Sequence, residues 1–287
     1  MYPYHKAKLV FHRASMKEWA KQYPKAKYIE YDQDFEITDD MFAFDTFEHT
    51  LDRIGLRLIE SPMFLLTREE HENLGVSFRH HLFYKKMMTL FDLPFDRSYD
   101  KDNRKPFPAT YHEPPIEFYD VPEAQEYVET NFPENIGNPR LWLPHTRRGA
   151  LRLMKDFVEK KIAGFGPYED AAREDVVIGY HSGLAAVMNI GLITAQEVLS
   201  YVCQSFDGVN NISSYEGFIR QLFWREYMAY VYLKKRKELA RSNIFNHRRE
   251  LPIDWRAPEM PAIDQIIEKI HTYAYAQDRK STRLNSS

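Results

Sequence analysis

The first third of the chain alternates between helical and extended patterns of hydrophobic residues. Residues 6–23 and 45–55 carry apolar side chains at helical spacing, and the second stripe ends at Gly55, which suits a helix C-terminus. Residues 25–32 alternate as a strand does, and residues 56–62 are short, apolar and stopped by a proline. This order predicts a parallel sheet with crossover helices. Because a doubly wound sheet opens with a strand and this chain opens within a helix, we expect the first strand to be missing.

The pattern then changes twice along the chain. Residues 92–140 are rich in Pro, Asp and Asn but also in Tyr and Phe, which predicts a connector packed on one or both domains. From about residue 145 the pattern is helical. Residues 147–166 form an amphipathic stripe that we expect to end at Gly164 and Gly166. Thr194 is expected to cap the next helix, because a glutamate follows three residues later.

One later helix mixes charge and aromatic surface on every face. Residues 216–233 read EGFIRQLFWREYMAYVYL, and neither side of this helix is purely apolar. The pattern is typical of a helix buried on most sides with its arginines and glutamates paired, or of one that borders a large polar-aromatic ligand. The partner of Arg220 or Arg225 is therefore Glu216, Glu226 or a ligand phosphate, since a buried arginine without a partner is costly.

Composition limits the classes of function. The chain has 287 residues, 15% of them aromatic, and a formal net charge of −3, so any contact with nucleic acid must be local. Cys203 is the only cysteine, which excludes an internal disulfide and an all-cysteine metal site. We find no signal peptide and no apolar run of the roughly 18 residues that span a bilayer. These features predict a protein of a reducing compartment, cytoplasmic or nuclear, with no membrane partner.

The candidate sites do not match a short catalytic motif. Residues 180–194, YHSGLAAVMNIGLIT, place small residues after Tyr180, His181 and Ser182, which suits either a phosphate at a helix N-terminus or a closely packed helix pair. The basic run 234–249 is either a solvated helix end or a contact to a phosphate backbone. The neighbouring His80 and His81 face different ways and are poorly placed to share a metal.

Seven blocks in a fixed order carry a resemblance to a known family. They read ESPMFLLTREE (60–70), FRHHLFYKKMM (78–88), DKDNRKPF (100–107), FGPYEDA (165–171), HSGLAAVMNIGLIT (181–194), EGFIRQLFWREYM (216–228) and MPAIDQIIEKIHTYAYA (260–276). Together they resemble the photolyase/cryptochrome superfamily, and within it the photolyase-related branch of prokaryotic (6–4) photolyases that carry an iron–sulfur cluster. The resemblance covers nearly all of residues 5–276.

The resemblance implies a fold class and a domain order. The fold class is α/β followed by all-α. Residues 1–91 would form an incomplete Rossmann-like domain of the antenna type, residues 92–144 an interdomain connector, and residues 145–276 part of a helical FAD-binding domain. Residues 277–287 are polar and aperiodic, and we interpret them as a non-native tail. We expect the chain to be truncated at both ends.

The resemblance also implies site residues, cofactors and partners. The residues expected to contact FAD are Tyr180, His181, Ser182, Leu184, Arg220 and Arg225. Those expected to contact UV-damaged DNA are Gln221, Trp224, Lys234, Lys235, Arg248 and Arg249. An antenna chromophore of the ribityllumazine type is expected only in a full-length parent, and we expect the protein to be a monomer.

Several departures from the family pattern qualify this picture. Ala185 stands where many relatives have a serine that contacts the flavin diphosphate. Ala262 stands where the first cluster cysteine is expected, so we expect no iron–sulfur cluster in this chain. Gln277 and Asp278 replace the His-His-Ile segment of the family. The sequence RQLFWREY is one residue shorter than the iron–sulfur relatives' RQIIGWREY and has the spacing of other branches.

The activity implied for the parent protein is light-driven repair of UV-induced pyrimidine lesions by an electron from reduced FAD. Two alternatives stay open: a cryptochrome-like blue-light photosensor, and an inactive fragment that binds no flavin. Because much of the flavin pocket lies outside this sequence, we expect the isolated chain to bind no flavin. We assign no catalytic residue.

Overall fold

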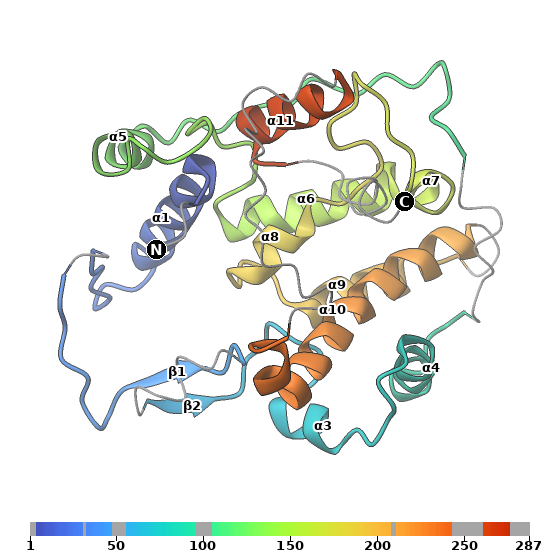
Figure 1. The fold of residues 1–287 in the computed structure, drawn as a ribbon, viewed down its shortest axis with the longest axis horizontal. Helices are drawn as coiled ribbons and strands as arrows, with labels where there is room; N and C mark the ends of the chain where they lie inside the picture. The colour runs from blue at the N-terminus through green and yellow to red at the C-terminus, as the bar shows by residue number, and fades with distance from the viewer. Residues whose placement is uncertain are drawn as a thin grey trace. The chain divides into compact units, whose positions relative to one another are not determined.

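The chain folds into two compact units, each built from segments far apart in the sequence (Figure 1). The structure is a computed structural model that describes residues 4–30, 33–47, 56–95, 105–207, 211–242 and 261–275. The first unit collects residues 1–29, 99–192 and 251–287, and the second collects residues 30–98 and 193–250. The predicted domains follow chain order instead, and their boundaries stay a prediction.

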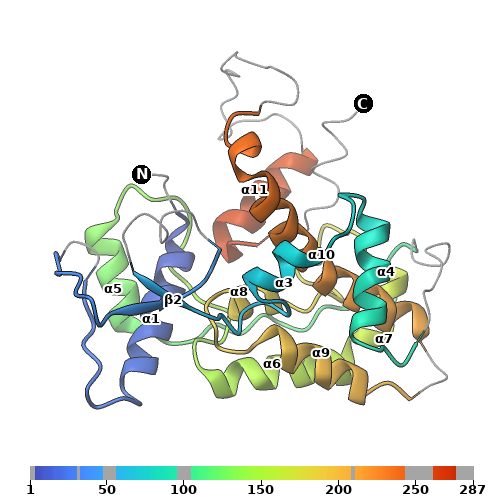
Figure 2. The ribbon, with the colours of Figure 1, turned by 90° about the horizontal axis from the view of Figure 1, so that it is seen from below.

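The first unit is helical in its described part. Its helices are α1 (Lys6–Ala20), α5 (Pro122–Asn131), α6 (Arg147–Lys160), α7 (Ile162–Tyr168), α8 (Leu184–Asn189) and α11 (Pro261–Tyr273). Helix α1 packs against α5, as Figure 2 shows, and Arg13 Nη2 lies 2.6 Å from Glu123 Oε1 between them. Helix α1 confirms the helix predicted from residue 6. Helix α5 lies inside the predicted connector, and Pro122 fits its first turn because no intrahelical N–H is needed there.

The predicted end of the helix after residue 147 is wrong. Helix α6 ends at Lys160, and α7 continues through Gly164 and Gly166 to Tyr168. Gly164 is present because of side-chain packing and does not end the helix. A Cβ atom on Gly164 would lie only 2.2 Å from Cε1 of Tyr180, so the glycine makes room for an aromatic ring.

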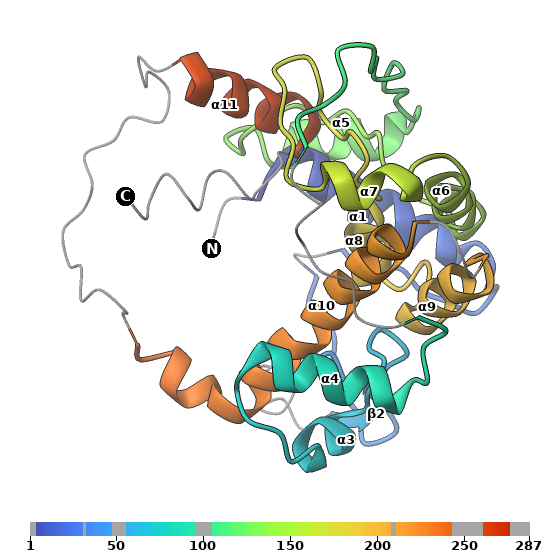
Figure 3. The ribbon, with the colours of Figure 1, turned by 90° about the vertical axis from the view of Figure 1, so that its right-hand side faces the viewer.

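The second unit combines helices with a small sheet. Its elements are β1 (Phe42–Phe44), β2 (Arg57–Ile59), α3 (Arg68–Asn73), α4 (His80–Leu90), α9 (Ala195–Gln204) and α10 (Ile212–Leu239). Helix α10 packs against α3, α4 and α9, and Figure 3 shows α3 and α4 beside it. Strands β1 and β2 pair in parallel, with Ala43 opposite Leu58. The predicted strand near residues 56–62 and its parallel pairing are confirmed, whereas β1 was not predicted.

Two further predictions differ in outcome. The strand predicted at residues 25–32 is wrong for residues 25–30, which form a turn and irregular chain. Instead of pairing in a sheet, Tyr28 presents its ring to Arg13 and Lys17, with the cations 5.6 and 5.0 Å from the ring centroid. The helix predicted at residues 45–55 lies outside the described residues from position 48 onward. Before that point, Phe47 has a left-handed φ of 66° and is not helical.

Helix starts in the second unit follow the predicted side-chain chemistry. The capping box at Thr194 is confirmed, because its hydroxyl accepts the Glu197 N–H and the Glu197 carboxylate accepts the Thr194 N–H. Thr67 and Glu70 form the same arrangement at the start of α3.

None of the helices in the described ranges is long and apolar enough to cross a membrane. The Rossmann-like arrangement followed by a helical domain stays a prediction.

Candidate functional site

Helix α10 carries most of the predicted ligand contacts of the second unit. It is 28 residues long, and its buried positions include carboxylates as well as aromatic and aliphatic side chains. A buried carboxylate requires a partner, because an isolated ionised group is very costly to remove from water. The structure supplies those partners inside the protein. The predicted pairing of arginine with glutamate along this helix is therefore confirmed.

The first buried carboxylate belongs to Glu216, whose side chain is 1% exposed. The Tyr84 hydroxyl on α4 donates a hydrogen bond to Glu216 Oε1 at 2.6 Å, and this bond links α4 to α10. One turn further along α10, Arg220 Nε lies 3.7 Å from the same oxygen. Arg220 is thus placed beside a carboxylate of its own helix, and its side chain is 16% exposed.

Arg225 is also engaged inside the second unit. Its Nη1 donates to the carbonyl oxygen of Met63 at 2.5 Å and lies 3.5 Å from Glu226 Oε1. The guanidinium carbon stands 4.3 Å from the centroid of the Phe64 ring. Burial lowers the pKa of the guanidinium, and the neighbouring Glu226 carboxylate opposes that shift. Arg225 therefore connects helix α10 to the loop that precedes α3.

Glu226 forms a buried pair with His71 that sequence reasoning missed. Both side chains are 0% exposed, and His71 Nε2 lies 3.6 Å from Glu226 Oε2. His71 Nδ1 lies 2.9 Å from the Thr67 carbonyl oxygen, so Nδ1 carries a proton that it donates. Burial raises the pKa of Glu226 to about 7 and lowers the pKa of His71. The pair joins α3 to α10 across 155 residues of sequence, and no local pattern marks it.

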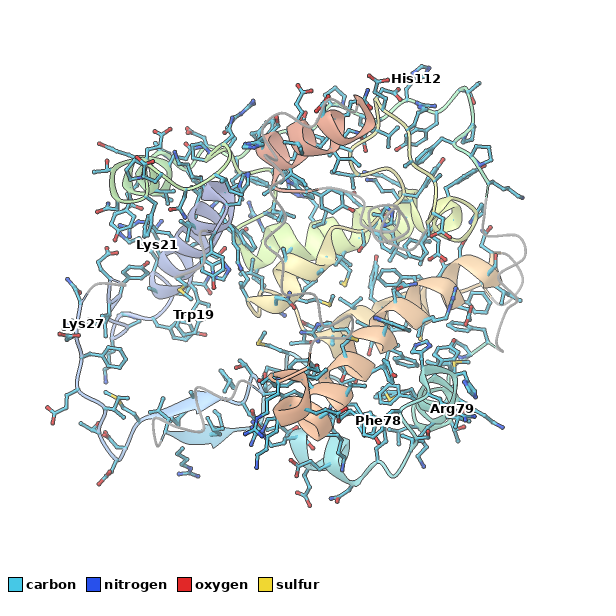
Figure 4. All side chains as sticks on the ribbon, viewed as in Figure 1. Trp19, Lys21, Lys27, Phe78, Arg79 and His112 are labelled. Carbon is cyan, nitrogen blue, oxygen red and sulfur yellow. The ribbon has the colours of Figure 1, made fainter. Side chains whose placement is uncertain are left out.

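Trp224 forms an aromatic group at the surface of the second unit. Its side chain is 44% exposed, and its ring centroid lies 4.1 Å from that of His80 and 5.4 Å from that of Tyr227. At this exposure the indole of Trp224 is not part of the buried core. His80 begins α4, and Phe78 and Arg79, labelled in Figure 4, lie immediately before it. The His80 ring is tilted by 53° to the indole, and the two rings together form a partly exposed aromatic surface.

Cations extend this surface along α10. Lys235 Nζ stands 4.9 Å from the centroid of the Phe78 ring, and Lys234 Nζ donates to the Glu72 carbonyl oxygen at 2.6 Å. Gln221 lies one turn before Trp224 on α10 and is partly exposed. The predicted contacts Arg248 and Arg249 lie outside the described residues. We name the group formed by Phe78, His80, Trp224, Tyr227 and Lys235 the aromatic–basic surface.

The predicted block at Tyr180 belongs to an aromatic cluster of the first unit. The Tyr180 ring packs nearly parallel to those of Phe107 and Tyr168, at centroid distances of 6.0 and 5.1 Å. The Tyr111 ring adds a further contact at 5.1 Å. Burial raises the pKa of Tyr180, so its hydroxyl stays protonated at neutral pH.

The residues after Tyr180 turn sharply into α8. Gly183 has a left-handed φ of 68°, and a Cβ atom there would lie 3.3 Å from Cη2 of Trp142. The Ser182 hydroxyl accepts the Leu184 N–H at 3.2 Å, and the His181 ring meets Phe165 edge-on. Leu184 is 0% exposed, so its side chain belongs to the core. This turn presents polar groups of His181 and Ser182 at partly buried positions.

The predicted site residues thus form two groups, one in each unit. Tyr180, His181, Ser182 and Leu184 are brought together in the first unit, and the described α10 residues are brought together in the second. Within each group the side chains lie on one turn or one helix. The signal that could have located the His71–Glu226 pair is weak, because a single histidine and a single glutamate occur in many helices.

Comparisons with known proteins agree with the resemblance carried by the sequence blocks. A family profile described as deoxyribodipyrimidine photo-lyase-related protein matches residues 34–142. A (6-4) photolyase of Agrobacterium fabrum is 31% identical over 163 residues, which cover 54% of this chain and 32% of that protein. An uncharacterized protein of Acanthamoeba polyphaga mimivirus is 37% identical over 90 residues, which cover 31% of this chain and 69% of that protein.

These matches define the class of protein. Over residues 34–142 the chain matches the deoxyribodipyrimidine photo-lyase-related protein family, which confirms the predicted photolyase-related branch. It spans only about a third of the length of the Agrobacterium photolyase that it matches (32%).

Proposed function

We propose that this chain is part of a photolyase-like flavoprotein that repairs UV-induced pyrimidine lesions in DNA by light-driven electron transfer from reduced FAD. The match of residues 34–142 to the photolyase-related family supports the class of activity, and the aromatic–basic surface of α10 is the observation that carries the proposal to DNA. The proposal includes an incomplete Rossmann-like domain followed by part of a helical flavin-binding domain.

The DNA part of the proposal rests on local chemistry, since the formal net charge of the chain is −3. An exposed indole beside an imidazole offers a stacking platform for a base taken out of the duplex, and stacking contributes about 1–3 kcal/mol per base. Lys235 lies about three helical turns along α10 from Trp224, beside Phe78, and its ammonium group is 3.2 Å from the exposed Glu238 carboxylate. A DNA phosphate can take the place of that carboxylate. A surface of this composition suits a nucleic acid better than an apolar partner.

The flavin part of the proposal fits the described residues only in part. In its favour, Tyr180, His181 and Ser182 are consecutive, partly buried residues of the turn that leads into α8. Against it, the Ser182 hydroxyl already accepts a backbone N–H, and Arg225 is committed to Met63 and Glu226. A bound flavin would supply the electron for the repair. The residues of this chain would hold its diphosphate at His181 and Ser182.

The first experiment is an absorption spectrum of the purified chain from about 300 to 550 nm, with and without added FAD. Repair of a lesion-containing oligonucleotide under blue light is then measured. A flavin band that elutes with the protein, together with light-dependent repair, is the result expected for a photolyase, and it would contradict the expectation from the sequence that the isolated chain binds no flavin. A flavin band without any repair would favour a photosensor, and no flavin at saturating FAD would refute the flavin proposal for this chain.

The surface itself is tested with Trp224→Ala, which removes the stacking platform. We expect affinity for lesion-containing DNA to fall about tenfold, the equivalent of about 1.4 kcal/mol, while the melting temperature changes little because the indole is already open to solvent. Phe42→Ala is the matched control, since Phe42 is an exposed aromatic residue (61%) on β1 of the same unit. Equal losses of affinity in both variants would contradict the assignment of Trp224 to DNA.

A further inference from the structure

A carboxylate from the predicted connector is held by three consecutive backbone N–H groups. Val177 N–H donates to Glu113 Oε2 at 2.5 Å, and the N–H groups of Ile178 and Gly179 donate to Oε1 at 2.9 and 2.6 Å. Hydrogen bonds to an ionised acceptor are roughly twice as strong as neutral ones. Glu113 therefore satisfies three donors of this turn at once.

The same turn is attached to its surroundings at two other points. Arg173 donates to the carbonyl oxygens of Pro108 and Tyr111 at 3.0 and 2.6 Å. From α11, Lys269 Nζ donates to the carbonyl oxygens of Arg173 and Val176 at 3.1 and 2.8 Å. Segments 108–113 and 173–179 are thus joined along their length. Figure 4 labels His112, the residue before Glu113.

The charge of Glu113 is matched by its surroundings. Besides the three N–H donors, the ammonium groups of Lys161 and Lys269 interact with this carboxylate. Burial raises the pKa of Tyr111 and of Tyr275 to about 12, and the Glu113 carboxylate contributes to both shifts. Both phenols are therefore uncharged at neutral pH. A neutral side chain at position 113 would leave the donors and cations of this turn without their anion.

The turn leads directly into the predicted flavin-contact block. Gly179 has a left-handed φ of 59°, and a Cβ atom there would lie 2.7 Å from Cζ of Phe107. Tyr180 follows at once and packs on that same ring. The conformation of residues 177–179 therefore decides where the backbone of His181 and Ser182 lies.

We propose that Glu113 is the positioning residue of this block, holding the turn 177–179 so that Tyr180, His181 and Ser182 face a flavin diphosphate. This inference rests on the proposed function. It assigns a role in cofactor binding to a segment that the sequence predicted to be only a connector. Glu113 acts through the turn and does not itself contact the cofactor.

The test compares Glu113→Gln with two matched controls in the same unit. Glu117→Gln removes the charge of an exposed glutamate four residues away, and Val128→Ala weakens the core of α5 at a distance from the turn. Hydrogen exchange of the 177–179 amides, the melting temperature and the dissociation constant for FAD are measured for each variant. For Glu113→Gln we expect exchange about tenfold faster at these amides and FAD binding about tenfold weaker. We expect Val128→Ala to lower the melting temperature without either local effect.

Three outcomes would overturn the inference. They are unchanged exchange at residues 177–179 in Glu113→Gln, full FAD affinity despite faster exchange, and equal loss of FAD affinity in Val128→Ala. If Glu113→Gln does not fold, Glu113→Asp keeps the charge but shortens the reach by one methylene, and the same local effects are expected of it. If the wild-type chain binds no FAD, the proposed function fails, while amide exchange still decides whether Glu113 orders the turn.

Discussion

The buried His71–Glu226 pair predicts a specific dependence of stability on pH. Burial raises the pKa of Glu226 from an ordinary value of 4.5 to about 7. The folded protein therefore keeps a proton that the unfolded chain releases. The stability that this proton contributes is fully present below pH 4.5 and is lost as pH rises through 7. His71 acts with the opposite sign, because its lowered pKa makes stability fall as pH drops below 6.5.

Glu226→Gln separates the two contributions. The amide keeps the size of the side chain but stays uncharged at every pH, so only the glutamate contribution disappears. A shift from 4.5 to about 7 corresponds to about 3 kcal/mol at about 1.4 kcal/mol per pKa unit. We therefore expect the unfolding free energy of Glu226→Gln, relative to wild type, to rise by up to about 3 kcal/mol between pH 4.5 and 7.5.

The assay is urea unfolding followed by circular dichroism at pH 4.5, 5.5, 6.5 and 7.5. Glu72→Gln, which removes the charge of an exposed glutamate on α3, is the control. A Glu226→Gln difference that stays flat across this range would refute the assignment of a raised pKa to Glu226. A difference that falls with pH would mean that Glu226 is ionised and stabilised by Arg225.

Two further predictions concern packing and capping. Gly164→Ala places a Cβ atom 2.2 Å from the Tyr180 ring, so we expect a loss of about 1–3 kcal/mol in unfolding free energy, measured by urea titration. Gly164 lies within α7 and has no left-handed φ, so its backbone accepts alanine and the cost comes from the crowded ring. An unfolding free energy that is unchanged or raised in Gly164→Ala would contradict a packing role for Gly164. Thr194→Ala removes one half of the capping box and should lower the melting temperature, at a cost of about 1 kcal/mol. No change in melting temperature would show that this cap adds nothing.

The interpretation of glycines illustrates where sequence reasoning went wrong. Gly164 and Gly166 were expected to end a helix, because glycine is common just after the last helical turn. Helix α7 continues through both residues, since Gly164 instead provides room for Tyr180. The sequence shows where a glycine stands. It does not show whether the glycine is needed for an unusual backbone conformation or for the close approach of a neighbouring ring.

Local patterns predicted the elements that depend on neighbouring residues in the chain. The helix from residue 6, the strand near residue 57, the cap at Thr194 and the long helix through Trp224 all follow from periodicity or from side chains within four positions. The pairing of arginine and glutamate on that helix was also predictable, because a buried charge requires a partner.

Only the tertiary structure decided which groups meet across long stretches of chain. His71 reaches Glu226 across 155 residues, and Glu113 reaches the turn at Val177 across 64 residues. Each contact depends on the position of a single polar side chain, fully buried at His71 and partly buried at Glu113, and this leaves no periodic trace in the sequence. The spacing of apolar residues therefore determined where the helices of this protein form. Only the folded structure determined which group pairs with each polar side chain, because electrostatic partners must be close in space and need not be close in sequence.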